Sequence, residues 1–158
     1  MKSFVRQSSL FLLLGFFVGL IGCGQDEIQL PDQVLQGKID GKDWEMKFAN
    51  AYIFSSDLKY QIRFLSTVES GEDPCAIPST ANAHVSMVFR PQIGSFSIPL
   101  PIFEESARFN VNLGNSVVAT SGFLEIFDIS NSRIFGYLQA HLDDDNSVEG
   151  SFEAVFCN

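Results

Sequence analysis

The chain has 158 residues, a formal net charge of −9 at pH 7, an apolar content of 46% and 16 phenylalanines. Its length suits one domain with a sizeable core. The acidic balance argues against a surface that binds nucleic acid, because phosphate contacts need clustered Lys and Arg. Solubility alone explains such a negative charge.

The first 22 residues have the layout of a secretory signal. Positive charge at Lys2 and Arg6 is followed by an apolar stretch over residues 10–21, and a small residue then precedes Cys23. The apolar stretch is short for a helix that crosses a bilayer and stays there. We therefore expect residues 1–22 to be removed, which leaves eight basic and 19 acidic side chains and a formal charge of −11.

The four residues Leu20-Ile21-Gly22-Cys23 resemble the lipobox of bacterial lipoproteins. In that family a diacylglycerol is added to the cysteine thiol, the chain is cut before the cysteine, and the new N-terminus is acylated. The resemblance implies that Cys23 is lipidated and anchors the protein in a lipid bilayer, since several acyl chains hold a membrane better than one. It implies a location at the outer membrane, on the periplasmic face or on the cell surface. An ordinary transmembrane helix, or a signal cut elsewhere, is the alternative.

Residues 23–33 are expected to form a lipidated tether. After Cys23 they contain no periodic apolar pattern and include Pro31. A stretch of about ten residues spans roughly 30 Å when fully extended. The acidic start, Gly24-Gln25-Asp26-Glu27, resembles the export tags of Bacteroidetes-type surface lipoproteins, which favours display on the cell surface.

The next part of the chain alternates apolar and polar residues with the period of β-strands. Residues 34–39 predict a strand, Asp40-Gly41 is a favoured two-residue hairpin turn, and the apolar positions of 44–48 continue the alternation. Residues 58–65 predict a further strand in which Leu58, Tyr60, Ile62 and Phe64 share one face. Residues 84–89 predict another strand of the same kind.

Two segments in the middle of the chain have other patterns. Residues 91–101 carry Pro91, Pro99 and Pro101, so we expect an edge strand or a loop there. Residues 102–109, "IFEESARF", are the sole helical candidate, with one or two turns.

The C-terminal third contains a regularly spaced set of glycines, because Gly122, Gly136 and Gly150 are fourteen residues apart. Each glycine begins a predicted strand of seven or eight residues, and this spacing is typical of an antiparallel meander. Alternate positions on the glycine side are expected to form the core; they are Leu124, Ile126, Leu138, Ala140, Phe152 and Ala154.

The opposite side of these three strands mixes aromatic and polar side chains. Phe123, Phe127 and Tyr137 lie there among polar residues that include Glu125 and Gln139. Aromatic residues carry much of the energy of protein interfaces. We therefore select Phe123, Phe127 and Tyr137 as the candidate interaction face.

These patterns predict an all-β fold over residues 34–158, arranged as an antiparallel β-sandwich. A closed, lipocalin-like β-barrel is the alternative, because alternation does not determine strand order. The hairpin "IDGKDW" and the G-x-[LF] strands resemble small Bacteroidetes-type lipoproteins, in which a hairpin of the N-G-K-x-W kind opens a β-sandwich. Here Asp40 replaces the usual Asn. The resemblance implies a fold rather than an activity.

With Cys23 acylated, Cys75 and Cys157 remain as the two other cysteines. Two thiols outside the cytoplasm most often form one disulfide. Neither a CxxC pair nor a nearby base indicates a redox or nucleophilic cysteine. We therefore expect a structural Cys75–Cys157 disulfide.

No catalytic, metal-binding or cofactor-binding motif stands out. His84 and His141 occur on strand faces with polar residues, where we expect solvated side chains, although the two could bind a metal if they face one another, and one of them alone could serve as a general base. The acidic run 143–149 has the oxygen-rich character of a weak Ca²⁺ site, but Asp and Asn also form ordinary turns. Carboxylates at Glu104-Glu105 and in 69–73 are expected to be solvated rather than catalytic.

Three functional hypotheses follow. The first is a non-enzymatic, membrane-anchored module that binds an envelope protein or an extracellular ligand. The second is a carrier of a small apolar ligand inside a β-barrel, and the third is an envelope hydrolase. The missing catalytic motifs favour the first hypothesis.

Overall fold

The computed structural model describes residues 33–53, 58–66, 75, 83–99, 106–112 and 115–157. Within these ranges the chain forms eleven β-strands and no helix, which confirms the predicted all-β class. No helix there is long and apolar enough to span a bilayer. The predicted signal peptide, Cys23 and all but the last residue of the tether lie outside the described residues.

The strands are β1 (Gln36–Ile39), β2 (Lys42–Glu45), β3 (Phe48–Ile53), β4 (Tyr60–Leu65), β5 (His84–Phe89), β6 (Gly94–Ile98), β7 (Ala107–Asn112), β8 (Asn115–Val118), β9 (Ser121–Ile129), β10 (Arg133–Asp143) and β11 (Asn146–Phe156).

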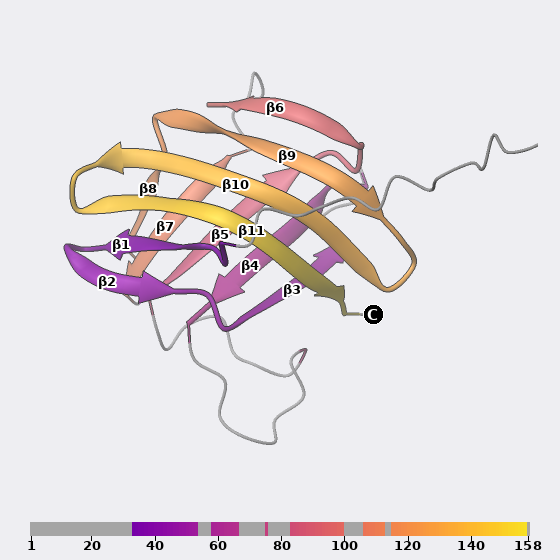
Figure 1. Ribbon diagram of the computed structural model, residues 1–158, viewed down its shortest axis with the longest axis horizontal. Helices are drawn as coiled ribbons and strands as arrows, with labels where there is room; N and C mark the ends of the chain where they lie inside the picture. Colours follow the sequence, from indigo (N-terminus) through magenta and orange to yellow (C-terminus); the bar gives the residue numbers. More distant parts are fainter. Residues whose placement is uncertain are drawn as a thin grey trace, which may run out of the picture.

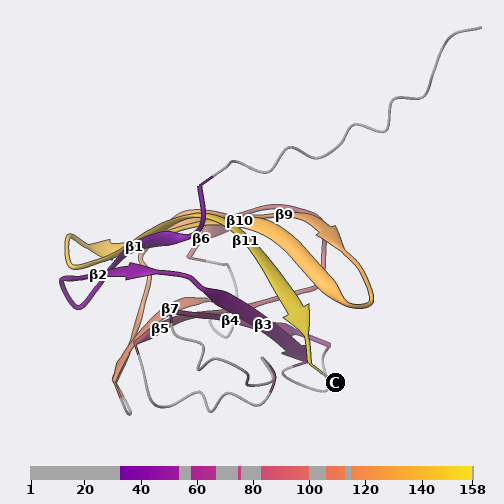
Figure 2. The same ribbon diagram turned by 60° about the horizontal axis from the view of Figure 1, so that its bottom comes forward.

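These strands form one curled, mixed sheet in the order β6-β9-β10-β11-β3-β4-β5-β7-β8, with β1 and β2 attached beside β11. Figure 2 shows two layers: β1, β2, β6, β9 and β10 form one, and β3, β4, β5 and β7 form the other. β11 joins the layers, because it pairs with β1 near Glu149 and runs parallel to β3 near Val155. Within the described ranges the end strands β6 and β8 do not pair, so the sheet is an open, sandwich-like half-barrel.

The opening hairpin has the predicted turn. Asp40 and Gly41 have φ angles of 55° and 70°, both in the left-handed region that a two-residue hairpin of the type I′ class requires. The peptide N–H of Gly41 donates to the carbonyl of Asp145, so this turn contacts the turn between β10 and β11. Figure 1 shows the β1–β2 turn and the β10–β11 turn side by side at the left of the view.

The predicted meander is confirmed as β9, β10 and β11, although the strands have 9, 11 and 11 residues and are longer than expected. Its three glycines lie where neighbours leave no room for a side chain. A Cβ on Gly122 would lie 2.0 Å from the carbonyl oxygen of Gln139, and one on Gly150 would lie 2.6 Å from the Cα of Leu35. A Cβ on Gly136 would lie 2.5 Å from a neighbouring backbone oxygen. Glycine recurs every fourteen residues because neighbouring segments approach the backbone too closely at these positions for a side chain.

The core lies between the two layers. All six positions predicted on the glycine side are at most 2% exposed, which confirms that expectation. The facing layer contributes large buried side chains from β4, β5 and β7; they include Ile62, Phe64, Val85, Met87, Phe89 and Phe109. The rings of Phe64 and Phe152 meet edge to face across the layers, with centroids 4.9 Å apart. Such contacts fill the interior with side chains from both layers.

Two local expectations were wrong. Leu58 is 62% exposed and has a φ of 57°, because β4 begins only at Tyr60. The helical candidate fails over residues 107–109, which belong to β7 and pair with β5; long-range pairing overrides the local preference there. Residues 102–105, including Glu104-Glu105, lie outside the described residues, as do 69–73. The proline-containing middle segment forms the edge strand β6, as expected.

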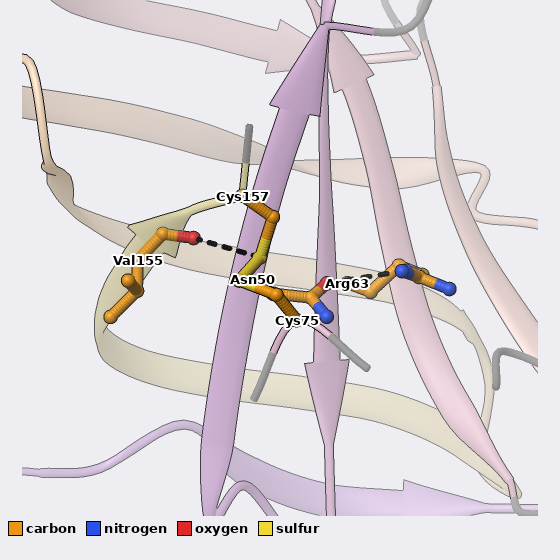
Figure 3. Close-up of a disulfide and its surroundings, with 5 residues drawn as sticks. All are labelled: Asn50, Arg63, Cys75, Val155 and Cys157. Carbon is orange, nitrogen blue, oxygen red and sulfur yellow. Dashed lines mark hydrogen bonds between the residues drawn. A yellow bond between two sulfur atoms is a disulfide. The ribbon is translucent and has the colours of Figure 1, made fainter. Parts of the chain in front are cut away.

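The predicted disulfide joins Cys75 to Cys157, with Cα atoms 5.4 Å apart and a sequence separation of 82. Figure 3 shows it at the end of β11, where the N–H of Cys157 donates to the carbonyl of Ala51 in β3. Beneath this end, buried Asn50 accepts a hydrogen bond of 3.2 Å from Nε of Arg63. The disulfide therefore closes a long ring at the junction of the two layers.

Candidate functional site

The outward side of β9, β10 and β11 has a regular arrangement set by strand register. Gln139 lies between Phe123 of β9 and Glu149 of β11. Tyr137, the next outward residue of β10, lies opposite Glu125. We call this surface the aromatic face; it comprises Phe123, Glu125, Phe127, Arg133, Phe135, Tyr137, Gln139, Glu149 and Glu153.

The structure brings two of the three predicted aromatic residues together. The rings of Phe123 and Tyr137 stack, with centroids 5.6 Å apart and an interplanar angle of 17°. Phe127 lies farther along β9 at a β-bulge, where the register shifts between Phe135 and Gly136. Among the described residues, Phe127 makes no ring contact. The stacked pair is therefore the centre of the face and Phe127 its margin.

Three members of the aromatic face were not found by sequence reasoning: Arg133, Phe135 and Glu149. Phe135 is half-buried on β10 and lies opposite Glu153. Glu149 accepts a hydrogen bond from the hydroxyl of Tyr137. Alternation from Tyr137 signals Phe135, but the partner of Tyr137 depends on the register of β10 with β11, which alternation does not supply.

The environment of Tyr137 changes its acidity. Burial, together with the hydrogen bond to Glu149 and the negative charge of that carboxylate, raises the pKa of Tyr137 to about 12 from 10.0. The phenol therefore stays neutral and acts as a donor at physiological pH. Its ring is held between Phe123 and Glu149, which fixes the orientation of the stacked pair.

The charges of the aromatic face are unequally paired. Arg133 forms an ion pair with Glu153 at its margin. Glu149 is engaged by the Tyr137 hydroxyl, a neutral donor. No ion pair between described residues includes Glu125. The centre of the face therefore combines stacked rings with carboxylates that no cation of the described chain neutralises.

A groove of about 550 Å³ adjoins this face where the two layers separate. It is lined by Val34, Glu45, Met46, Lys47, Phe48, Ala49, Ser151, Phe152, Glu153 and Val155. Strand alternation puts Ser151 on the outer side of β11, yet it is buried, because the segment Gln33–Leu35 hydrogen-bonds to both its N–H and its carbonyl. Glu153 belongs to both the groove and the aromatic face, so the two surfaces are continuous.

The two histidines are not brought together. His84 is on β5 and His141 on β10, in different layers of the sheet. The expectation that His84 is solvated was wrong: it is 8% exposed, on a strand whose six residues are all buried, so that both faces of β5 are covered. Within the described part of the chain, no group of three or more His, Cys, Asp and Glu side chains is arranged to hold a metal ion.

The acidic run 143–149 begins as a hairpin turn. The carboxylate of Asp143 accepts hydrogen bonds from the N–H of Asp145, at 3.1 Å, and from the side-chain amide of Asn146, at 2.9 Å. Asn146 in turn accepts a hydrogen bond from the N–H of Asp40. Asp143 and Asn146 therefore stabilise the two adjacent turns, as Asp and Asn ordinarily do.

Comparison of the chain with protein families, with curated proteins and with solved structures found no match.

Proposed function

We propose that this chain is a membrane-anchored lipoprotein, acylated at Cys23, whose β domain binds another molecule without catalysing a reaction. The anchor is supported by the lipobox-like Leu20-Ile21-Gly22-Cys23 after a charged and apolar start. The binding role is supported by one observation above all: Phe123 and Tyr137 stack on a half-buried, outward sheet face. An envelope protein or an extracellular ligand is the expected partner.

Stacked aromatic rings on an outward face are suited to binding. Aromatic pairs bury large areas and lose little side-chain entropy when a partner covers them, so they are enriched at the centres of interfaces. Tyr137 is already held by Glu149 and Phe123, so little ordering remains to be done on binding. A preorganised pair of this kind favours recognition of a partner over a purely structural role.

The anchor is tested by labelling cells that express the full chain with an alkyne analogue of palmitate. We expect label in the wild-type protein and none in Cys23→Ser, which should also accumulate with its signal uncut. Equal labelling of both proteins would remove Cys23 as the acylation site. Protease treatment of intact cells, with lysed cells as the control, then places the domain on the surface or in the periplasm.

The binding face is tested by changing Phe123, Phe127 and Tyr137 together to Ser and recovering cross-linked partners from cells. The triple variant should lose the partner while its Trp44 fluorescence stays that of a folded protein. A matched control changes three exposed apolar residues outside the aromatic face, Ile53, Ile93 and Val118, to Ser; these are 59%, 58% and 37% exposed. Undiminished recovery with the aromatic triple variant would refute the assignment of this face.

The groove favours a second candidate function, the carriage of a small apolar ligand. Its volume of about 550 Å³ and its apolar lining residues, among them Met46, Phe48 and Phe152, suit an apolar molecule of modest size. Native mass spectrometry of the protein purified from its membrane should then show a co-purified mass beyond that of the acylated chain. A mass that corresponds to the acylated chain alone would reject carriage.

A further inference from the structure

The centre of the aromatic face has carboxylates on two sides of the stacked rings. Glu125 lies directly opposite Tyr137 in the pairing of β9 with β10. Glu149 lies on the other side, on β11, and accepts a hydrogen bond from the Tyr137 hydroxyl. A group placed over Phe123 and Tyr137 therefore lies between two negative charges carried by two different strands.

Few cations offset these charges. Four carboxylates lie on this side of the three strands: Glu125, Glu149 and Glu153 of the face, and Asp128 opposite Phe135. The three strands contribute a single cation there, Arg133, whose guanidinium is paired with Glu153. Lys38 of β1 lies opposite Ser147, whereas the residue of β1 opposite Glu149 is Gln36. The centre of the face therefore retains negative charge, and the whole chain adds to it with 19 acidic against ten basic residues.

This combination selects for a cation. The faces of aromatic rings attract ammonium and guanidinium groups, and the attraction grows when carboxylates stand beside the rings. An anionic ligand would meet repulsion from Glu125 and Glu149. A neutral ligand would gain from the rings but would leave both carboxylates to lose water without a counter-charge. Charge complementarity therefore favours a positively charged partner.

We propose that the aromatic face binds a basic segment of a partner protein, with an Arg or Lys side chain over the Phe123–Tyr137 pair and its charge between Glu125 and Glu149. This inference rests on the proposed function, which assigns binding to the face, and it adds the chemistry of the partner. Arg suits the site best, because its planar guanidinium stacks on rings and pairs with carboxylates at once.

The test uses the full, lipidated chain in detergent micelles and a fluorescent (Arg-Gly)5 peptide as the probe, followed by anisotropy. We expect binding that weakens as salt is raised, and little binding of (Glu-Gly)5. The double variant Glu125→Gln/Glu149→Gln should weaken binding about tenfold, since it removes two partly exposed ion pairs. Both substitutions keep side-chain size, and Trp44 fluorescence reports that the fold is retained.

A matched control separates the site from general attraction to an acidic protein. Asp43→Asn/Asp144→Asn makes the same change in net charge at two exposed positions on β2 and in the β10–β11 turn. It should leave affinity for the peptide within about twofold of wild type, as exposed charges at a distance contribute little. Equal losses from the two double variants would overturn the inference in favour of non-specific attraction.

The remaining outcomes distinguish the inference from the function on which it rests. One such outcome is that the peptide does not bind while the Phe123/Phe127/Tyr137 triple variant still loses its cellular partner. In that case the face binds a partner that is not basic, so the inference is refuted and the proposed function stands. If the triple variant also keeps its partner, the proposed function falls with it. Salt-independent binding of a neutral oligosaccharide that requires Phe123 and Tyr137 would replace the basic segment with a glycan and overturn the inference.

Discussion

Replacement of Phe152 by Ala should strongly destabilise the domain, because this ring joins the two layers. Phe152 is 2% exposed, and its ring centroid lies 4.9 Å from that of Phe64 in the facing layer. It also lies so close to Gly136 that a Cβ there would come within 2.6 Å of the ring. Removing a buried Phe from such a site costs about 3–5 kcal/mol, since the cavity collapses only in part.

The free energy can be measured by urea titration followed by the fluorescence of Trp44. Trp44 is the one tryptophan of the chain, is 6% exposed, and donates its indole N–H to the carbonyl of Ala83 at 3.2 Å, so unfolding must change its emission. For a domain of this size the expected loss corresponds to a fall in Tm of about 10–20 °C. Val118→Ala, at an exposed position, is the control and should change stability by less than about 0.5 kcal/mol.

A double-mutant cycle isolates the contact between the layers. Because the edge-to-face pair itself contributes about 0.5–1.5 kcal/mol, Phe64→Ala and Phe152→Ala together should cost less than the sum of the two single changes. A cost for Phe152→Ala below about 1 kcal/mol, or strict additivity of the pair, would refute the view that these rings hold the layers together.

Three further predictions concern the glycines, the hydroxyl of Tyr137 and the disulfide. Gly122→Ala should destabilise the fold more than Gly94→Ala in the same urea titration. The two glycines have similar φ angles, 132° and 138°, but only at Gly122 would a new Cβ meet a backbone atom, at 2.0 Å. Equal losses of stability would contradict the argument from close backbone approach. The phenolate absorbance of Tyr137 should appear near pH 12, so its contribution to stability is full below pH 10 and is lost between pH 10 and 12. Glu149→Gln should lower that pKa only in part, because burial is the largest cause; an unchanged titration would refute the hydrogen bond. Reduction of the disulfide should cost up to about 4–5 kcal/mol by the chain-entropy model for a ring with a separation of 82, and an unchanged urea midpoint would show that it does not stabilise the fold.

Much of the fold follows from local chemistry. Asp40-Gly41 predicts its turn because few residues accept positive φ at two successive positions. The fourteen-residue spacing of Gly122, Gly136 and Gly150 predicts the meander, and the structure adds the reason, which is close backbone approach. Period-two alternation also places Phe123 and Tyr137 on one outward face.

The remaining features depend on contacts that local patterns do not contain. The bulge in β9 leaves Phe127 with no opposite residue on β10, and the register of β10 with β11 brings Glu149 to Tyr137. His84 is buried because both faces of β5 are covered, a fact that requires the tertiary structure. The parallel pairing of β11 with β3 near Asn50 joins segments about a hundred residues apart, which alternation cannot reveal.

Site-specific photo-cross-linking in cells that express the full chain tests directly whether the aromatic face contacts a partner. A photoreactive residue replaces Gln139, which lies between Phe123 and Glu149, and in a control strain it replaces exposed Ser116 on β8. If the aromatic face binds a partner, a discrete adduct forms from position 139 and disappears when Phe123 and Tyr137 are changed to Ser, and no such adduct forms from position 116. An adduct at 139 that survives loss of both rings, or equal adducts from the two positions, would contradict binding at this face.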